Sequence, residues 1–322
     1  MRTWLNPALA VIVCLAITWL LPSHRQSYLV YVAALAGINA IAAVGLTIVN
    51  GFAGQFSLGH AGFMAIGGYT AAILTQTLQL SPDGGPISQS LFAACCMAGG
   101  VAAAAAGVIV GLPSLRLRGD YLAIVTLGFG EIVRVAIENM TITGGATGLV
   151  GIAPMATLLW IGLWLIATTT LALRLRHSSH GRALRALRSD ATAAEAMGIP
   201  TTRYKVAAFG MGAFFAGIAG ALLGHYLQLL SPKDFTWLRS VEIVAMIVLG
   251  GLGSVSGAIL GAMALTLAPE ALRSVQQVTG GTDLRMVLYA LLLLVVMIRR
   301  PQGLLGPQEL PAWWCSLRQR LK

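Results

Sequence analysis

The chain has 322 residues, of which 57% are hydrophobic and only 10% are charged. Soluble globular domains carry roughly a quarter charged residues, so this composition excludes the ordinary soluble classes of protein. The net charge of +10 does not indicate nucleic-acid binding, because the basic residues cluster in short loops and no soluble domain exists to present a basic face. Apolar runs of about 18 or more residues recur along the chain, each long enough to cross a bilayer. The sequence therefore predicts an all-α polytopic integral membrane protein.

The apolar runs predict about eight to ten transmembrane helices in a single domain, 1–322. The first run resembles a signal peptide, but it lacks a clear small-x-small cleavage site and is interpreted as an uncleaved helix. The predicted spans are 4–22, 28–50, 60–79, 89–112, 121–139, 154–173, 206–229, 241–251, 255–269 and 284–299.

Residues 50–63, NGFAGQFSLGHAGF, interrupt the apolar pattern with glycines and polar side chains. Non-helical backbone at membrane depth is tolerated only where it is buried in protein or lines a wet cavity. Glycines permit a turn and close helix approach. We expect this first break to line or gate a permeation path, and the alternative is a packing elbow against another subunit. Its defining residues are Asn50, Gly51, Gly54, Gln55, Ser57 and His60.

Three charged residues, Glu131, Arg134 and Glu138, share one face of the predicted helix 121–139, since they are spaced i, i+3, i+7. A charge at a membrane helix centre costs about 2.5–3.5 kcal/mol on insertion scales, so these side chains must face protein or water. The favoured interpretation is an ion pair between Glu131 and Arg134, with Glu138 reaching the membrane interface. The alternative is a proton relay or a solute site. Glu242 is interpreted as a first-turn acid favoured by the helix dipole.

One substantial polar segment, 174–205, contains seven Lys and Arg residues against two acids, and we expect it to face the cytoplasm. Thr192 and Glu195 fit a capping box, and Gly198 followed by Pro200 fits a helix stop. A short helix, about Asp190–Met197, is therefore predicted. Its apolar residues need either a partner protein or the membrane surface to cover them.

The C-terminal tail, 300–322, is also basic and expected in the cytoplasm, so an even number of passes must separate it from the polar segment. The long apolar run 241–269 must then turn back on itself or contain a re-entrant piece. A second break in its middle carries Gly250, Gly253 and Ser256, with the same spacing as Gly51, Gly54 and Ser57. An internal inverted repeat is one interpretation, and coincidence among 38 glycines is the other.

Motifs of enzymes are missing from the sequence: it has no GxxxxGK[ST], no HExxH and no GxSxG. We therefore expect a protein that is not an enzyme and that binds neither a cofactor nor a metal. The four cysteines show no metal-ligand spacing and no disulfide framework. His225 is interpreted as an interior residue with satisfied hydrogen bonds.

Five segments together resemble one family, the LivM-type permease subunits of branched-chain amino acid ATP-binding-cassette (ABC) importers. The resemblance covers roughly residues 30–305. The segments are Gly45–Ala72 (GLTIVNGFAGQFSLGHAGFMAIGGYTAA), Arg118–Arg134 (RGDYLAIVTLGFGEIVR), Thr143–Ile152 (TGGATGLVGI), Arg182–Gly220 and Val248–Ala262 (VLGGLGSVSGAILGA).

This resemblance implies a heteromeric importer of leucine, isoleucine and valine in the bacterial cytoplasmic (inner) membrane. The implied partners are a LivH-like sister permease, two cytoplasmic ABC ATPase subunits that hold the ATP, and a periplasmic or extracellular binding protein. Both termini are expected in the cytoplasm, and the chain contacts the lipid bilayer but no nucleic acid.

The resemblance also makes 174–205 the ATPase-coupling loop, although its residue order departs from the family's strict E-A-A-x-x-x-G pattern. The corresponding residues are Asp190, Ala194, Glu195, Ala196, Met197, Gly198 and Pro200. Two alternatives stay open. One is the same machine with urea or short amides as cargo, and the other is a secondary transporter coupled to protons through Glu131 or Glu138.

Overall fold

The computed structural model describes residues 28–82, 84–114 and 120–271, together with residues 294, 298–299, 302–304, 306 and 309. The predicted span 4–22 and nearly all of 284–299 lie outside the described residues, as do most of the tail 300–322, Cys14 and Cys315. The described part is helical except for one small two-stranded sheet, which confirms the predicted all-α class.

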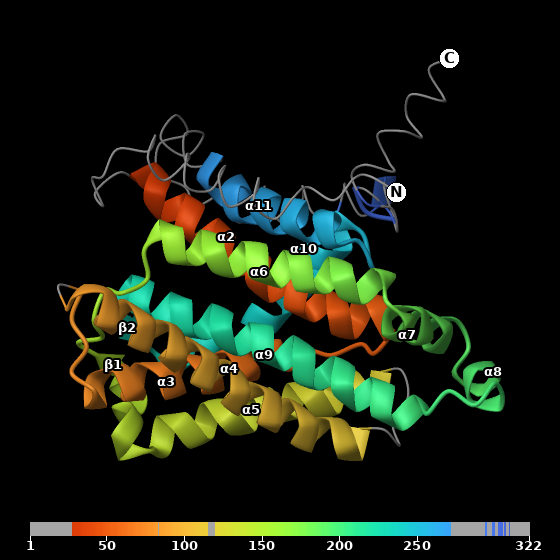
Figure 1. Ribbon diagram of the computed structural model, residues 1–322, viewed down its shortest axis with the longest axis horizontal. Coiled ribbons are helices and arrows are strands. Elements are labelled where there is room, and N and C mark those ends of the chain that lie inside the picture. The colour runs from red at the N-terminus through yellow and green to blue at the C-terminus, as the bar shows by residue number, and fades with distance from the viewer. Residues whose placement is uncertain are drawn as a thin grey trace.

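Most described helices are arranged along one axis, with α7 and α8 at one end and the sheet at the other (Figure 1). We call the end that carries α7 and α8 the loop end. The helices are α2 (Tyr28–Leu46) with a π-helical turn (Thr47–Phe52), α3 (His60–Thr77), α4 (Gly85–Ser114), α5 (Asp120–Asn139), α6 (Leu158–His177), α7 (Ser179–Ser189), α8 (Ala191–Ala196), α9 (Thr201–Leu227), α10 (Trp237–Gly250) and α11 (Val255–Ala271). Short 3₁₀ turns cover Thr141–Thr143, Gly145–Thr147 and Pro232–Phe235. Strand β1 (Leu149–Val150) pairs antiparallel with β2 (Leu229–Leu230).

Four described helical stretches are long and apolar enough to cross a membrane, namely Tyr28–Phe52, Gly85–Leu112, Leu158–His177 and Thr201–Leu227. The other predicted spans that the structure describes, 60–79, 121–139, 241–251 and 255–269, are helical as well, but they are shorter or more polar. The number of membrane passes stays a prediction.

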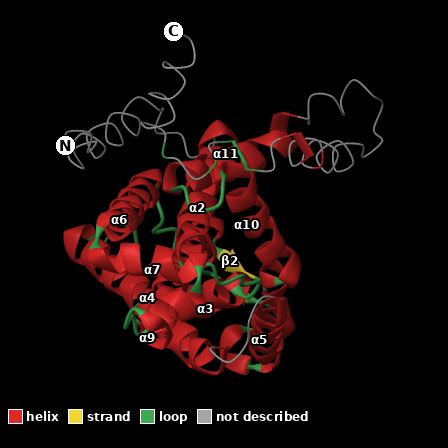
Figure 2. Ribbon diagram, turned by 90° about the vertical axis from the view of Figure 1, so that its right-hand side faces the viewer, coloured by secondary structure: helices red, strands yellow, loops and turns green. Residues whose placement is uncertain are grey.

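Helix α2 forms the centre of the bundle. In the view along the axis from the loop end, α3, α6, α9, α10 and α11 surround it (Figure 2). Nearly all its residues after Val32 are buried, because the helix is apolar on every side. Its buried Asn39 is paired: Arg239 of α10 donates to Asn39 Oδ1 (2.6 Å), and Asn39 Nδ2 donates to Thr266 of α11 (2.9 Å).

Helices α3, α4 and α9 pack backbone to backbone. A methyl group added at Gly67 of α3 would overlap the main chain of Gly217 in α9, and one added at Gly99 of α4 would lie 2.5 Å from the Gly67 carbonyl oxygen. Small residues permit this approach where lipid gives no hydrophobic drive for helix association. The small residues of α3, α4 and α9 therefore bring these three helices into backbone contact.

Helices α2 and α9 run antiparallel. Tyr226 near the end of α9 donates to the Val30 carbonyl near the start of α2 (3.5 Å), while Gly45 near the end of α2 packs against Gly212. After α2 comes a stretch without α-helix, 53–59, which is followed by α3, a turn and α4. After α9 comes a second such stretch, 228–236, which contains β2 and a 3₁₀ turn and is followed by α10, a turn and α11. This order of elements occurs twice in the described chain, and the two leading helices, α2 and α9, run in opposite directions.

The repeat predicted from spacing was wrong in its alignment. Gly51 lies in the π-helical turn, but its counterpart Gly250 ends α10. Ser57 lies in the irregular stretch 53–59, but its counterpart Ser256 lies in the first turn of α11. Small residues at equal spacing do not specify a helix or a turn. The predicted turn within the run 241–269 is found, because the run splits into α10 and α11, which pack closely where Gly250 meets Gly257.

Several helix boundaries also differ from prediction, among them those of α6 and α9. Helix α6 starts at Leu158 because Thr157 caps it by accepting from the Trp160 amide (3.5 Å), and it extends to His177. Helix α9 starts at Thr201 and includes a polar first turn that hydropathy could not assign to a membrane helix. His225 is satisfied as predicted, since its ring contacts the Ala221 carbonyl (2.7 Å) and the Thr75 hydroxyl (2.9 Å).

Candidate functional site

The polar loop folds into two short helices, α7 and α8, joined by Asp190. Asp190 is the C-cap of α7 and the N-cap of α8. Its Oδ1 accepts from the backbone amides of Thr192 (2.8 Å) and Ala193 (3.0 Å). The predicted capping box on Thr192 was therefore wrong by two residues, because the acid before it satisfies the free amides and suits the positive end of the helix dipole.

Helix α8 ends where the sequence predicts. Gly198 has a left-handed backbone (φ +82°), its amide donates to the Glu195 carbonyl (2.9 Å), and the Ile199 amide donates to the Ala194 carbonyl (3.1 Å). Glycine adopts this conformation without steric cost, which stops the helix before Pro200. Ala194 is buried, whereas Glu195 and Ala196 are exposed and Met197 is 83% exposed. An exposed methionine at the tip of a capped helix is suited to contact a partner.

The first break starts in the π-helical turn and continues as an irregular, non-helical stretch from 53 to 59. Asn50 Oδ1 accepts from the Ser57 amide (3.2 Å), Ser57 Oγ accepts from the Gly59 amide (3.4 Å), and Thr126 Oγ1 of α5 accepts from the Leu58 amide (2.9 Å). Asn50, Ser57 and Thr126 thus satisfy backbone groups that the interruption frees.

Three polar side chains of this break, those of Asn50, Gln55 and His60, are buried. His60 Nε2 lies 3.0 Å from the Ala42 carbonyl oxygen. Among the described residues, Asn50 Nδ2 and Gln55 Oε1 have no hydrogen-bond partner. A buried amide donor and a buried amide acceptor are therefore left over at this break, and each such group costs about 1–3 kcal/mol if it stays unpaired.

The second break is a tight turn between α10 and α11. Gly251 (φ +114°) and Gly253 (φ +93°) have backbone conformations that favour glycine. A short piece near the C-terminus packs on this turn: the Leu304 amide donates to the Leu249 carbonyl (2.8 Å), and Gly303 and Gly306 lie against Gly251.

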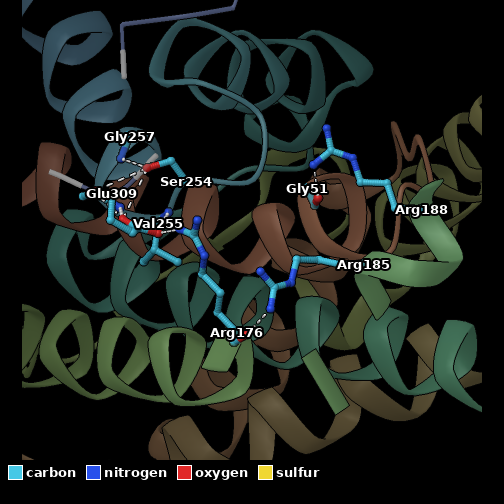
Figure 3. A network of polar contacts seen from close by, with 9 residues as sticks. Gly51, Arg176, Arg185, Arg188, Ser254, Val255, Gly257 and Glu309 are labelled. Atoms are coloured by element: carbon cyan, nitrogen blue, oxygen red, sulfur yellow. Dashed lines mark hydrogen bonds and ion pairs between the residues drawn. The ribbon is translucent and has the colours of Figure 1, made fainter. Parts of the chain in front are cut away.

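The two breaks touch each other at the loop end. A Cβ added at Gly51 would lie 2.9 Å from the Gly253 amide nitrogen. Arg188 of α7 lies beside both, because its Nη1 donates to the Gly51 carbonyl (2.6 Å) and lies 2.8 Å from the Cβ position of Gly253 (Figure 3). The two breaks predicted from sequence therefore form one site, together with an arginine from the polar loop.

Glu309 makes a second connection to the loop. Its carboxylate accepts from the backbone amides of Val255 and Ser256 (both 2.9 Å), contacts the hydroxyls of Ser254 and Ser256, and forms an ion pair with Arg176 in the last turn of α6 (Figure 3). Ser256 thus helps to hold Glu309 at the start of α11. Nothing in the sequence around Glu309 predicts this role.

The charged cluster on α5 is an ion-paired triad. Arg134 contacts Glu131 (2.7 Å) and also Glu138 (2.8 Å), so the predicted Glu131–Arg134 pair is confirmed and Glu138 joins it. Glu131 Oε1 also accepts from the Trp237 amide at the start of α10 (3.1 Å). Glu242 was wrongly assigned to the first helical turn, since it lies further along α10 and pairs with Arg239 (2.8 Å).

Comparison with known families identifies the family of the chain. A family described as "Branched-chain amino acid transport system / permease component" matches residues 28–297. The chain belongs to this family. It is thus a permease component and not an enzyme, and its family and apolar helices make it a multi-pass membrane protein.

Relatives of the permease include two types of transport protein. The high-affinity branched-chain amino acid transport system permease protein LivM of Salmonella typhimurium is 37% identical to it, over 92% of this chain and 74% of the relative. LivM of Escherichia coli has the same identity and coverage. LivH of Salmonella typhimurium is 29% identical, over 85% of this chain and 93% of the relative. No solved structure matches the permease at a significant level.

The predicted site residues of the permease fall into three places. The two breaks and the base of the polar loop meet at one site. The charged triad lies on α5 and contacts the start of α10, and the tip of α8 projects from the loop end. No group of His, Cys, Asp and Glu among the described residues is placed to hold a metal.

Proposed function

We propose that the permease is the membrane-spanning subunit of an ATP-driven ABC importer for leucine, isoleucine and valine. The observation that carries this proposal is the link from α8 through α7 and Arg188 to both helix breaks. A permease driven by a separate ATPase needs an exposed surface that the ATPase can move, and a connection from that surface to the translocation path. It also needs two states that ATP binding stabilises differently. The cargo is proposed from the family description and from the names of the LivM relatives.

The proposed partners follow from the same arrangement. Two ATPase subunits, which hold the ATP, would contact α8 and the exposed Met197 at the loop end, so this chain itself binds no cofactor. The basic excess of 174–205 supports a cytoplasmic loop end and cytoplasmic termini in the inner membrane of a bacterium. A binding protein would deliver the amino acid at the opposite end, and a LivH-like sister permease would complete the path.

The sister permease is proposed to contact the face formed by α5 and α10. Carboxylates on this face are partly open: the side chain of Glu242 is 50% exposed and that of Glu138 is 36% exposed. Lipid solvates such groups poorly, so protein or water must cover them. Helix α4 has no acidic residue, and it exposes apolar side chains that suit lipid, including Ile87, Leu91, Val101 and Ile109.

Cysteine cross-linking tests this placement with two matched positions. Ile132 on α5 is 68% exposed and Ile109 on α4 is 66% exposed. In membranes containing the whole transporter, we expect Ile132→Cys to cross-link to cysteines introduced in the sister permease and Ile109→Cys to remain uncross-linked. The reverse pattern would place the sister subunit against α4.

Proteoliposomes test the energy source. We expect the complete transporter, with its binding protein, to take up leucine only when hydrolysable ATP is supplied to the ATPase side. Glu138→Gln should keep most of this uptake, because Arg134 still pairs with Glu131 and a partly exposed ion pair is worth only about 0–1 kcal/mol.

Uptake by this chain alone under a proton gradient, lost in Glu138→Gln, would instead support the proton-coupled alternative. A binding protein that prefers urea or short amides over leucine would change the cargo and leave the machine as proposed.

A further inference from the structure

Arg188 has an unusual position for a basic residue of a polar loop. It is in the last turn of α7, yet its guanidinium reaches the carbonyl of Gly51, 137 positions away in the sequence. The stem of the side chain lies on Gly54, whose Cβ position is 2.8 Å from Arg188 Cγ. Gly54 has φ +67°, so the first break bends at the point where the arginine crosses it.

The carbonyl that Arg188 binds belongs to the end of a helix. Gly51 is near the C-terminus of the π-helical turn that ends α2, where the last carbonyls lack helical amide partners. A guanidinium there forms a charge-assisted hydrogen bond and complements the negative end of the helix dipole. Because the backbone of Gly253 touches Gly51, the same guanidinium also lies against the second break.

The helix that carries Arg188 is joined tightly to α8. A single residue, Asp190, ends one helix and caps the other, so displacement of α8 must move the end of α7. The start of α7 is fixed independently, since Ser178 Oγ accepts from the Gly181 amide (3.2 Å) and Arg185 donates to the Arg176 carbonyl (3.3 Å). Leu184 and Leu187 anchor the buried face of α7. The folding of α7 therefore does not depend on the contact between Arg188 and Gly51.

We propose that Arg188 is the coupling latch of this permease: it holds the two helix breaks together at the loop end, and movement of α7 and α8 withdraws it to let the breaks separate. This inference rests on the proposed function, because it assigns the residue that carries movement from the ATPase-binding loop to the path. Arg188 acts through Gly51 and Gly253 and is a positioning residue.

The test uses the whole transporter, with its ATPase subunits and binding protein, in proteoliposomes. Two quantities are measured for each variant: leucine uptake, and ATP hydrolysed per leucine transported. Without the latch, the breaks should separate without movement of the loop. Arg188→Ala should then raise the ATP used per leucine by roughly tenfold to hundredfold, the effect of losing one charge-assisted hydrogen bond of about 1.5–3 kcal/mol. Arg188→Lys should recover part of the coupling, because an ammonium group also donates to a carbonyl.

Arg182 provides the matched control on the same helix. Its guanidinium bonds to the His177 carbonyl (3.3 Å) and the Ser179 hydroxyl (3.1 Å), both within the loop. We expect Arg182→Ala to leave the ATP cost per leucine unchanged. A purely structural role of Arg188 would lower uptake and ATP hydrolysis together, with an unchanged ratio, and would overturn the proposal.

A second measurement reports the accessibility of the first break directly. Gln55 is buried in the first break, so a cysteine at this position should be protected from a charged thiol reagent applied at the loop end. We expect labelling to become at least several-fold faster when Arg188→Ala is added, and equal labelling rates would contradict the latch. If the native transporter shows no ATP-dependent uptake, the proposed function fails. If it does and Arg188→Ala stays coupled, the latch alone fails.

Discussion

Replacing Gly67 by alanine is expected to destabilise the permease strongly. The added methyl group would overlap the main chain of Gly217 in α9, while the neighbouring α4 lies against the Gly67 carbonyl on another side. Backbone atoms cannot give way as a flexible side chain can, so α3 and α9 must separate. Overpacking of this kind costs about 1–3 kcal/mol or more. Thermal unfolding of the purified chain in detergent should show a clearly lower midpoint and a lower yield from membranes.

Gly128 on α5 gives the matched control for this prediction. It is helical, and no heavy atom lies within 4 Å of its Cβ position. Alanine favours a helix over glycine by up to about 1 kcal/mol, so Gly128→Ala should keep or raise the unfolding midpoint. The same chemical change should thus have opposite signs at the two positions. Equal effects at both would show that α3 and α9 do not pack as closely as described.

Replacing Gly198 by arginine is expected to separate the permease from the proposed ATPase subunit without disrupting the bundle. The position needs φ +82°, has no atom within 4 Å of its Cβ position and follows the exposed Met197. An arginine there would strain the left-handed turn by about 1–2 kcal/mol and place a charged side chain beside the proposed docking surface. ATPase bound to the purified permease should fall by about tenfold or more, equivalent to 1.4 kcal/mol of binding free energy, and leucine uptake should fall with it.

Gly151 provides a control that distinguishes the effect of backbone strain from the effect on ATPase binding. It also has a positive φ (+76°) and open space at its Cβ position, but it lies next to β1 at the opposite end of the bundle. Gly151→Arg should therefore retain the bound ATPase. If Gly198→Arg also retains it and transports normally, α8 is not the coupling surface.

Most of the fold could be predicted from the sequence because hydropathy depends on local composition. The starts of α3 and α11 agree with the predicted spans, and α5 differs by one residue. The start of α9 could not be predicted, because its first turn is polar although it is helical. The π-helical turn at Thr47–Phe52 also has no residue signature, since the extra residue per turn reflects packing rather than composition.

The candidate site was predictable in its local parts only. The spacing of Glu131 and Arg134 fixes their ion pair, and Gly198 fixes the end of α8, because both features depend on neighbours along one helix. The contacts of Arg188 with Gly51 and of Glu309 with Arg176 join segments far apart in the chain, so no periodicity reports them. For Arg188 the sequence indicated only a basic polar segment, and the tail that carries Glu309 was predicted only to be basic and cytoplasmic.

The irregular stretch 53–59 is a part of the bundle where the chain can change conformation at a low cost in free energy. A helix bends only by disrupting a cooperative ladder of backbone hydrogen bonds, whereas this stretch is held mainly by side chains, through Asn50, Ser57 and Thr126. Such bonds can be exchanged one at a time, for one another or for water. We therefore expect the ends of α2 and α3 to shift relative to each other at these seven residues when the permease changes state, while both helices stay intact.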